Sequence, residues 1–117
     1  MTIRKNLGNK GESAASDYLK QKGYSIVAAN WRCTVGEFDL VARDGETLVF
    51  VEVRTRRGGI DAALESITPR KRAILERTAY IYLDENAIES DWRIDVIAVT
   101  HTQGKPIIEH AENALDW

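Results

Sequence analysis

The stretch GEFDLVARDGETLVFVEVRT, residues 36–55, predicts two adjacent strands of a β-sheet joined by a tight turn. Asp44-Gly45 is a strong hairpin signal between two runs with strand character. The uninterrupted apolar run Leu48-Val49-Phe50-Val51 favours burial on both faces, as in a central strand. We therefore expect strands from Glu37 to Arg43 and from Glu46 to Arg54.

Helices and further strands are predicted on both sides of this hairpin. Apolar residues at helical spacing predict a helix from Leu7 to Lys22. A second helix is expected to begin at Thr68, the N-cap, with Pro69 in its first turn. The remaining strands are expected at Tyr24–Trp31, Trp92–Val99 and Pro106–His110. The order α-β-β-β-α-β-β predicts an α/β fold with a mixed central sheet flanked by helices.

Length and composition indicate one globular domain covering residues 1–117. Apolar residues make up 44% and charged residues 29%, which excludes a disordered chain. A single cysteine, Cys33, excludes an intramolecular disulfide and a multi-cysteine zinc site. No run of 18 apolar residues and no signal peptide is present, so we expect no membrane contact and a cytoplasmic location.

Charge is unevenly distributed along the chain. The net charge is −2, yet residues 52–77 carry seven basic and four acidic groups, while residues 84–117 carry two basic and eight acidic groups. A polyanion responds to a local patch more than to the total, so nucleic acid is not excluded as a partner. The alternative is that these charges only solvate helix faces.

Acidic residues are predicted to crowd one face of the hairpin. If Asp44-Gly45 is a two-residue loop, Glu37 faces Glu52, and Asp39 is a diagonal neighbour of Glu52. Alternation then groups these side chains on one face: Glu37, Asp39, Phe50, Glu52 and Arg54. Asp39 and Glu52 could share Mg²⁺ or Mn²⁺, hard cations that prefer carboxylate oxygens. Arg54 could stabilise charge on a phosphate, although Arg43 and Arg54 could also form purely structural salt bridges.

Further candidates flank this predicted face. Glu12 lies beside the buried stripe of the first helix and could lean over the sheet, or it could form a capping box with Asn9. Five basic residues could bind a nucleic-acid backbone or merely aid solubility: Arg56, Arg57, Arg70, Lys71 and Arg72. His101 and His110 show no metal-binding spacing, and we expect both at the surface.

The chain resembles the YraN family of bacterial proteins, uncharacterised but predicted to be endonucleases. The likeness rests on Glu12, on GEFDLVA at residues 36–42 and on VEVRTR at residues 51–56, and it extends over nearly the whole chain. That family is similar to the archaeal Holliday-junction resolvases, within the restriction-endonuclease-like PD-(D/E)xK superfamily. The resemblance implies an α-β-β-β-α-β core.

The resemblance also implies roles for individual residues. Glu12 matches the glutamate of the superfamily's first helix, Asp39 its metal-binding aspartate, and Glu52 the acidic residue of its (D/E)xK motif. The motif lysine is replaced by Arg54, and Phe38 stands where the superfamily has proline. The implied activity is Mg²⁺- or Mn²⁺-dependent cleavage of structured DNA, by analogy as a homodimer. The alternative is a catalytically inactive nucleic-acid-binding or protein-interaction module.

Overall fold

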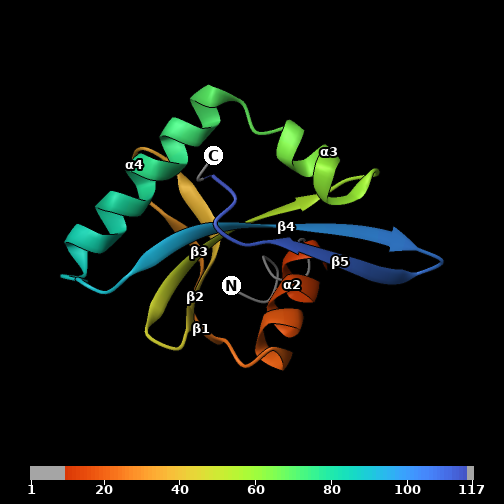
Figure 1. The fold of residues 1–117 in the computed structure, drawn as a ribbon, viewed down its shortest axis with the longest axis horizontal. Helices are drawn as coiled ribbons and strands as arrows, with labels where there is room; N and C mark the ends of the chain where they lie inside the picture. Colours follow the sequence, from red (N-terminus) through yellow and green to blue (C-terminus); the bar gives the residue numbers. More distant parts are fainter. Residues whose placement is uncertain (1–9, 116–117) are drawn as a thin grey trace.

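A five-stranded mixed sheet with the order β1-β2-β3-β4-β5 forms the centre of the molecule (Figure 1). The computed structural model describes residues 10–115. Its strands are β1 Ser25–Arg32, β2 Glu37–Asp44, β3 Thr47–Thr55, β4 Trp92–Thr102 and β5 Lys105–Ala111. β3 and β4 run parallel, and the other neighbouring pairs are antiparallel.

Within the described residues, three helices flank the sheet: α2 Lys10–Gln21, α3 Gly59–Glu65 and α4 Pro69–Glu85. α2 packs on one face, while α3 and α4 pack on the other (Figure 1). The restriction-endonuclease-like order α-β-β-β-α-β predicted from the sequence is confirmed. The expected helix start at Leu7 lies outside the described residues. Within residues 10–115, no helix is long and apolar enough to cross a membrane.

The short helix α3 was not predicted. The sequence indicated a loop from Gly58-Gly59 to the second helix, whereas the structure forms one further helix there. Seven residues are too few to show a helical period clearly, and no side chain caps the helix at Gly58. α3 nevertheless buries Ala63 in the same core as α4.

β3 is buried on both faces, as its apolar run predicted. Leu48 and Phe50 join the core beneath α3 and α4, and Val49 and Val51 join the core beneath α2. All four side chains are fully buried. β3 is therefore held between the helices on the two faces of the sheet, and this fixes the position of Glu52 and Arg54 at its end.

The predicted hairpin register was wrong by two residues. Asp44 pairs with Thr47, so the two-residue turn is Gly45-Glu46 instead of Asp44-Gly45. Gly45 has a φ of 62°, which glycine adopts readily at the first central position of a type II′ turn. A shift by two residues does not by itself move a side chain to the other face, because side chains alternate with a period of two.

Alternation itself fails at the far end of β2, which the sequence did not indicate. Phe38 and Val41 both pack in the core beneath α4, although residues three apart in a regular strand face opposite ways. Phe38 stacks on Phe50 with ring centroids 4.8 Å apart, so these two rings share a face. Glu37 does not oppose Glu52 as predicted. It pairs with Arg32 of β1, Oε1 to Nε at 3.2 Å.

Candidate active site

Asp39 lies where β2 and β3 cease to pair. The last described pair of this ladder is Leu40 with Val51. Beyond it, the Oδ2 atom of Asp39 accepts a hydrogen bond from the backbone N–H of Val53 at 2.7 Å. The Asp39 carboxylate thus accepts the backbone N–H that a carbonyl of β2 would accept in a regular ladder. Because Val53 directly follows Glu52, this bond holds Asp39 near Glu52. Burial raises the pKa of Asp39 although this hydrogen bond favours the ionised form.

Glu52 is the buried carboxyl group of this end of β3. Only 7% of the residue is exposed, and its Oε2 atom lies 3.1 Å from Nε of Arg54. Burial, and then the negative charge of Asp39, raise the pKa of Glu52 to about 7, whereas Lys71 and Arg54 lower it. Lys71 also lowers the pKa of Asp39, so this first-turn residue of α4 influences both carboxyl groups.

Glu12 approaches the same place from α2, on the opposite side of the sheet from α4. Its carboxyl group shares side-chain hydrogen bonds with Asp39 and Asn30. Burial, and then the charge of Asp39, raise the pKa of Glu12 to about 7. A proton on Glu12 can therefore be donated to Asp39 near neutral pH. The alternative partner in a capping box, Asn9, lies outside the described residues.

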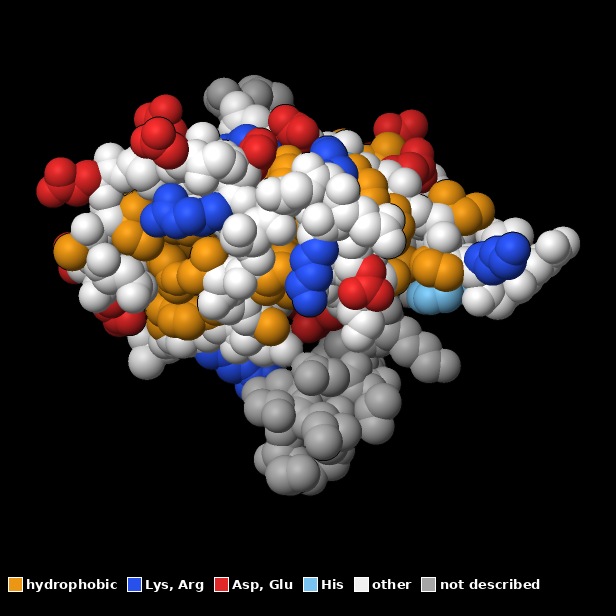
Figure 2. All heavy atoms as spheres, turned by 90° about the horizontal axis from the view of Figure 1, so that it is seen from below, with side chains coloured by type: hydrophobic (Ala, Val, Ile, Leu, Met, Phe, Trp, Pro, Cys, Tyr) orange, Lys and Arg blue, Asp and Glu red, His pale blue; other side chains and the backbone are white. Residues whose placement is uncertain are grey.

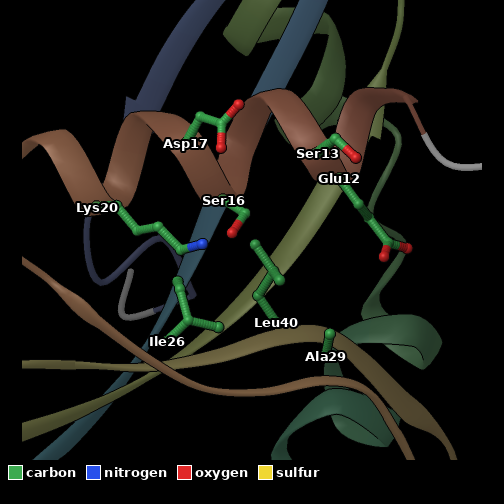
Figure 3. A pocket seen from close by; sticks show the side chains of 8 residues that line it. All are labelled: Glu12, Ser13, Ser16, Asp17, Lys20, Ile26, Ala29 and Leu40. Carbon is green, nitrogen blue, oxygen red and sulfur yellow. The ribbon is translucent and has the colours of Figure 1, made fainter. Parts of the chain in front are cut away.

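A hollow of about 430 Å³ separates α2 from β1 and β2 beside this cluster. Figure 3 shows Glu12 extending from α2 toward the strands at one end of the hollow, with Ser16 and Lys20 farther along the helix. The hollow gives water a path to the carboxyl group of Glu12. Its α2 wall is polar, whereas Ile26 and Leu40 line the sheet side.

Gly11 explains how α2 can come so close to β3. A Cβ atom at this position would overlap Oγ1 of Thr55. The bare backbone of Gly11 therefore lets the start of α2 rest against the end of β3. This contact places the next residue, Glu12, beside Asp39 of the sheet.

The predicted basic residues divide into two groups. Arg56 and Arg57 are exposed on the loop after β3, and Arg70 is exposed at the start of α4. Lys71 and Arg72 are half-buried in the first turn of α4, where Oγ1 of Thr68 accepts the N–H of Lys71 at 3.1 Å. Lys71 thus lies close enough to lower the pKa of both Asp39 and Glu52, whereas Arg56, Arg57 and Arg70 lie at the surface.

The donor chemistry at this site suits a hard divalent cation. In residues 10–115, no three His, Cys, Asp or Glu side chains are arranged to hold an ion by themselves. Mg²⁺ is commonly bound by only one or two carboxylates, with water and substrate phosphate completing its octahedron. Asp39 and Glu52 could supply such a pair, and Glu12 hydrogen-bonds the first of them.

Sequence analysis missed a second polar cluster, around Asp95 of β4. His110 was expected at the surface, and this was wrong: its side chain is 4% exposed and its Nε2 lies 2.7 Å from Oδ2 of Asp95. Nδ1 of the same ring lies 3.2 Å from the Tyr18 hydroxyl and 3.3 Å from Nζ of Lys22, which links β5 to α2. The sequence signal that could have revealed this cluster was Asp95 within the apolar strand segment 94–99, because a buried carboxylate needs hydrogen-bond or ionic partners.

Glu52→Gln is expected to stabilise the metal-free protein at pH 8 by on the order of 2 kcal/mol and to have little effect near pH 4.5. Because the pKa of Glu52 is raised from 4.5 to about 7, the folded state holds a proton that the unfolded state loses between these values. Wild-type stability from this group therefore falls as pH rises through that window. Urea unfolding in EDTA measures the difference, with the exposed Glu46→Gln as control. A pH-independent difference would contradict the raised pKa.

The fold and this cluster define a mixed α/β protein with a restriction-endonuclease-like core and carboxyl groups gathered where two central strands part. The chain belongs to the uncharacterised protein family UPF0102, whose family model matches residues 11–99. This confirms the resemblance to the YraN family. The family description states no activity.

Similar curated proteins cover almost the whole chain. A UPF0102 protein of Chloroflexus aurantiacus is 50% identical over 106 residues, 89% of this chain and 87% of the relative. Those of Herpetosiphon aurantiacus and Dehalococcoides mccartyi are 47% and 46% identical, and they cover 92% and 96% of this chain and 91% and 94% of the relatives.

Proposed function

We propose that this protein is a Mg²⁺- or Mn²⁺-dependent endonuclease that hydrolyses phosphodiester bonds in structured DNA. The observation that carries the proposal is the meeting of Glu12, Asp39 and Glu52, from three separate elements, at one end of the sheet. Buried carboxyl groups whose negative charges repel one another cost stability, which is a frequent property of functional sites. The proposed place of action is the cytoplasm, by analogy as a homodimer.

Each residue of the cluster has a distinct proposed role. Asp39 and Glu52 would hold the ion, and Glu12 would orient Asp39 through their hydrogen bond. When bound, the ion would supply a water of lowered pKa and stabilise the leaving oxygen. Arg56, Arg57, Arg70 and Arg72 would hold the backbone of the substrate on either side.

The cations closest to the carboxyl groups are proposed to stabilise the scissile phosphate. Arg54 stands at the position of the motif lysine, and a guanidinium does not give up its proton near neutral pH. Its Nε atom also forms an ion pair with Oε2 of Glu52 at 3.1 Å. Lys71 influences both carboxyl groups from α4 and so adds a second positive charge.

Lys71→Met is expected to reduce metal-dependent cleavage by roughly a hundredfold or more, the usual cost of removing one electrostatic stabiliser. Lys71→Arg should retain part of the activity because the charge remains. Single-turnover cleavage rates measure both variants. Arg77→Met, an exposed cation on the same helix, is the matched control and should cleave like wild type. Equal rates for Lys71→Met and wild type would remove Lys71 from the proposed site.

The proposal is tested by a cleavage screen over duplex, flap, four-way-junction and single-stranded DNA, with Mg²⁺, Mn²⁺ or EDTA. Metal-dependent cleavage of any structured substrate supports it. A second candidate, an inactive binding or interaction module, is favoured by the replacement of the motif lysine with Arg54. Calorimetric titration with Mn²⁺ separates the two when no cleavage is seen, because an inactive module needs no ion.

A further inference from the structure

The last two strands extend well past the rest of the sheet. β3 ends opposite Val99, whereas β4 continues to Thr102 and pairs with the start of β5. The outer pairs are Thr100 with Ile107, His101 with Pro106 and Thr102 with Lys105. Figure 1 shows this two-stranded ribbon projecting beyond α2 and α3. We call residues 100–107 the ribbon.

The turn at the tip gives the ribbon a defined shape. Gln103 and Gly104 have φ values of 53° and 78°. Positive φ at both central residues is the mark of a type I′ turn, whose twist matches that of the strands it joins. The ribbon is therefore a regular hairpin to its end, with a side chain at every position except Gly104.

The ribbon carries one lysine, neutral polar groups and no acidic residue, and its apolar members are Pro106 and the half-exposed Ile107. Residues 101–107 are all exposed, and they include His101, Gln103 and Lys105. No Asp or Glu lies between Thr100 and Ile108, although the chain has a net charge of −2. Figure 2 shows the outer part of the protrusion with blue and no red. This composition suits a polyanion.

The base of the ribbon is fastened to the basic loop after β3. Oγ1 of Thr100 donates to the Arg56 carbonyl at 2.9 Å, and the Arg56 N–H donates to the Val99 carbonyl at 3.2 Å. A hollow of about 220 Å³ lies between this loop and the ribbon, with Arg57 and His101 among its lining residues. Because the loop follows directly from the strand of Glu52 and Arg54, the ribbon and the carboxyl groups belong to the same end of the sheet.

We infer that the ribbon inserts into the major groove of a B-form DNA duplex while Arg56 and Arg57 contact its backbone. Neighbouring strands lie about 4.8 Å apart, and a major groove about 12 Å wide accepts a two-stranded β-ribbon. The deep, narrow major groove of A-form RNA does not. The inference rests on the proposed function and deepens it, because it identifies the substrate as DNA with a double-stranded arm.

Protein is a less suitable occupant of this surface than DNA. A partner strand would have to pair with the free edge of β5. Pro106 removes a backbone N–H from that edge, and proline on an edge strand is a common device against such pairing. The polar, cationic tip also differs from the apolar centre typical of protein interfaces.

The test is a shortened ribbon. Deleting His101, Thr102, Lys105 and Pro106 removes two pairs, keeps the Gln103-Gly104 turn and leaves Thr100 opposite Ile107. Fluorescence anisotropy in EDTA measures binding to a DNA duplex, the matching RNA duplex and a single DNA strand. We expect duplex DNA binding to weaken at least about tenfold. Binding to the single strand should change less than about twofold. Arg77→Ala, an exposed cation on α4, is the control and should bind like wild type.

A double substitution, Gln103→Ala with Lys105→Ala, repeats the test without altering the chain length, should the deletion fail to fold in a thermal melt. Unchanged duplex binding overturns the inference, as does an equal loss on the duplex and the single strand. No duplex binding by wild type, or loss of self-association on shortening the ribbon, overturns it as well. If the shortened ribbon selectively loses duplex binding but the wild-type protein cleaves no DNA, the DNA-binding role of the ribbon stands and only the proposed nuclease activity is rejected.

Discussion

Asp39→Ala is expected to remove Mn²⁺ binding and to lower metal-dependent cleavage by more than about a hundredfold. Loss of a group that merely orients a metal ligand typically costs 10- to 100-fold, so loss of a ligand itself should cost at least as much. Two carboxylates are proposed to hold the ion, and Glu52 alone would bind it weakly. Calorimetric titration and single-turnover cleavage measure the two effects on the same protein.

Asp39→Asn distinguishes this role from a structural one. The asparagine oxygen can still accept the hydrogen bond that Val53 N–H donates to Asp39 at 2.7 Å, whereas its negative charge is gone. We expect the Asn variant to unfold at nearly the wild-type urea concentration and still to lose Mn²⁺ binding. If Asp39→Asn binds the ion as wild type does, the metal hypothesis is wrong and Asp39 serves only to hold β3.

Asp95→Ala is expected to lower the free energy of unfolding by about 3–5 kcal/mol, the cost of breaking a buried ionic network by removing one partner. Asp95 is fully buried, and its Oδ1 accepts from Nε of Arg93 and from the N–H of Asn113, both at 2.9 Å. Its Oδ2 faces His110 at 2.7 Å. Removal of this carboxylate leaves a guanidinium and an imidazole without their common partner.

Urea unfolding at neutral pH measures the loss, with the exposed Asp17→Ala of α2 as control, which should change stability by less than about 0.5 kcal/mol. Burial alone raises the pKa of Asp95, but hydrogen bonds from His110 and Arg93 outweigh it and hold the pKa below 3.8. This stabilisation is therefore complete above pH 3.8 and disappears as pH falls through the lowered pKa. A loss below about 1 kcal/mol at neutral pH would contradict the network's role.

The two carboxylates of the hairpin were predictable because strand alternation is local. A hairpin joins residues 39 and 52 through a short turn, so their proximity survives an error of two residues in the register. The error arose because glycine serves at either central position of a two-residue turn. Only Gly45-Glu46 brings Leu40 opposite Val51.

The interruption in β2 was not predictable in the same way. Phe38 stacks on Phe50 because both rings fill the core beneath α4, and this demand overrides the alternation of β2. Asp39 then turns to the backbone of Val53 instead of standing on a flat face of the sheet. The packing of Phe38 on Phe50 thus set the direction in which the Asp39 carboxylate turns.

The other features that the sequence did not predict depend on contacts between residues far apart in the chain. Lys71 reaches the carboxyl groups only because α4 crosses back over the sheet, and His110 reaches Asp95 only because β5 returns beside β4. Neither pairing has a spacing that a local pattern could reveal. His110 was therefore misplaced at the surface, and Lys71 was interpreted as either a contact to a nucleic-acid backbone or a solubilising residue.

By itself, the sequence determined the family, the order of the main elements, the doubly buried central strand and the pair Asp39 and Glu52. The family follows from the motif residues at 36–42 and 51–56. The other features follow from helical and strand periods and from turn residues, all of which act between neighbours in the chain. Tertiary structure decided the exact register, the approach of α2 that brings Glu12 to Asp39, and the burial of Asp95 with His110. Those features depend on which large side chains fill the two cores, and that choice is made only when the helices pack against the sheet.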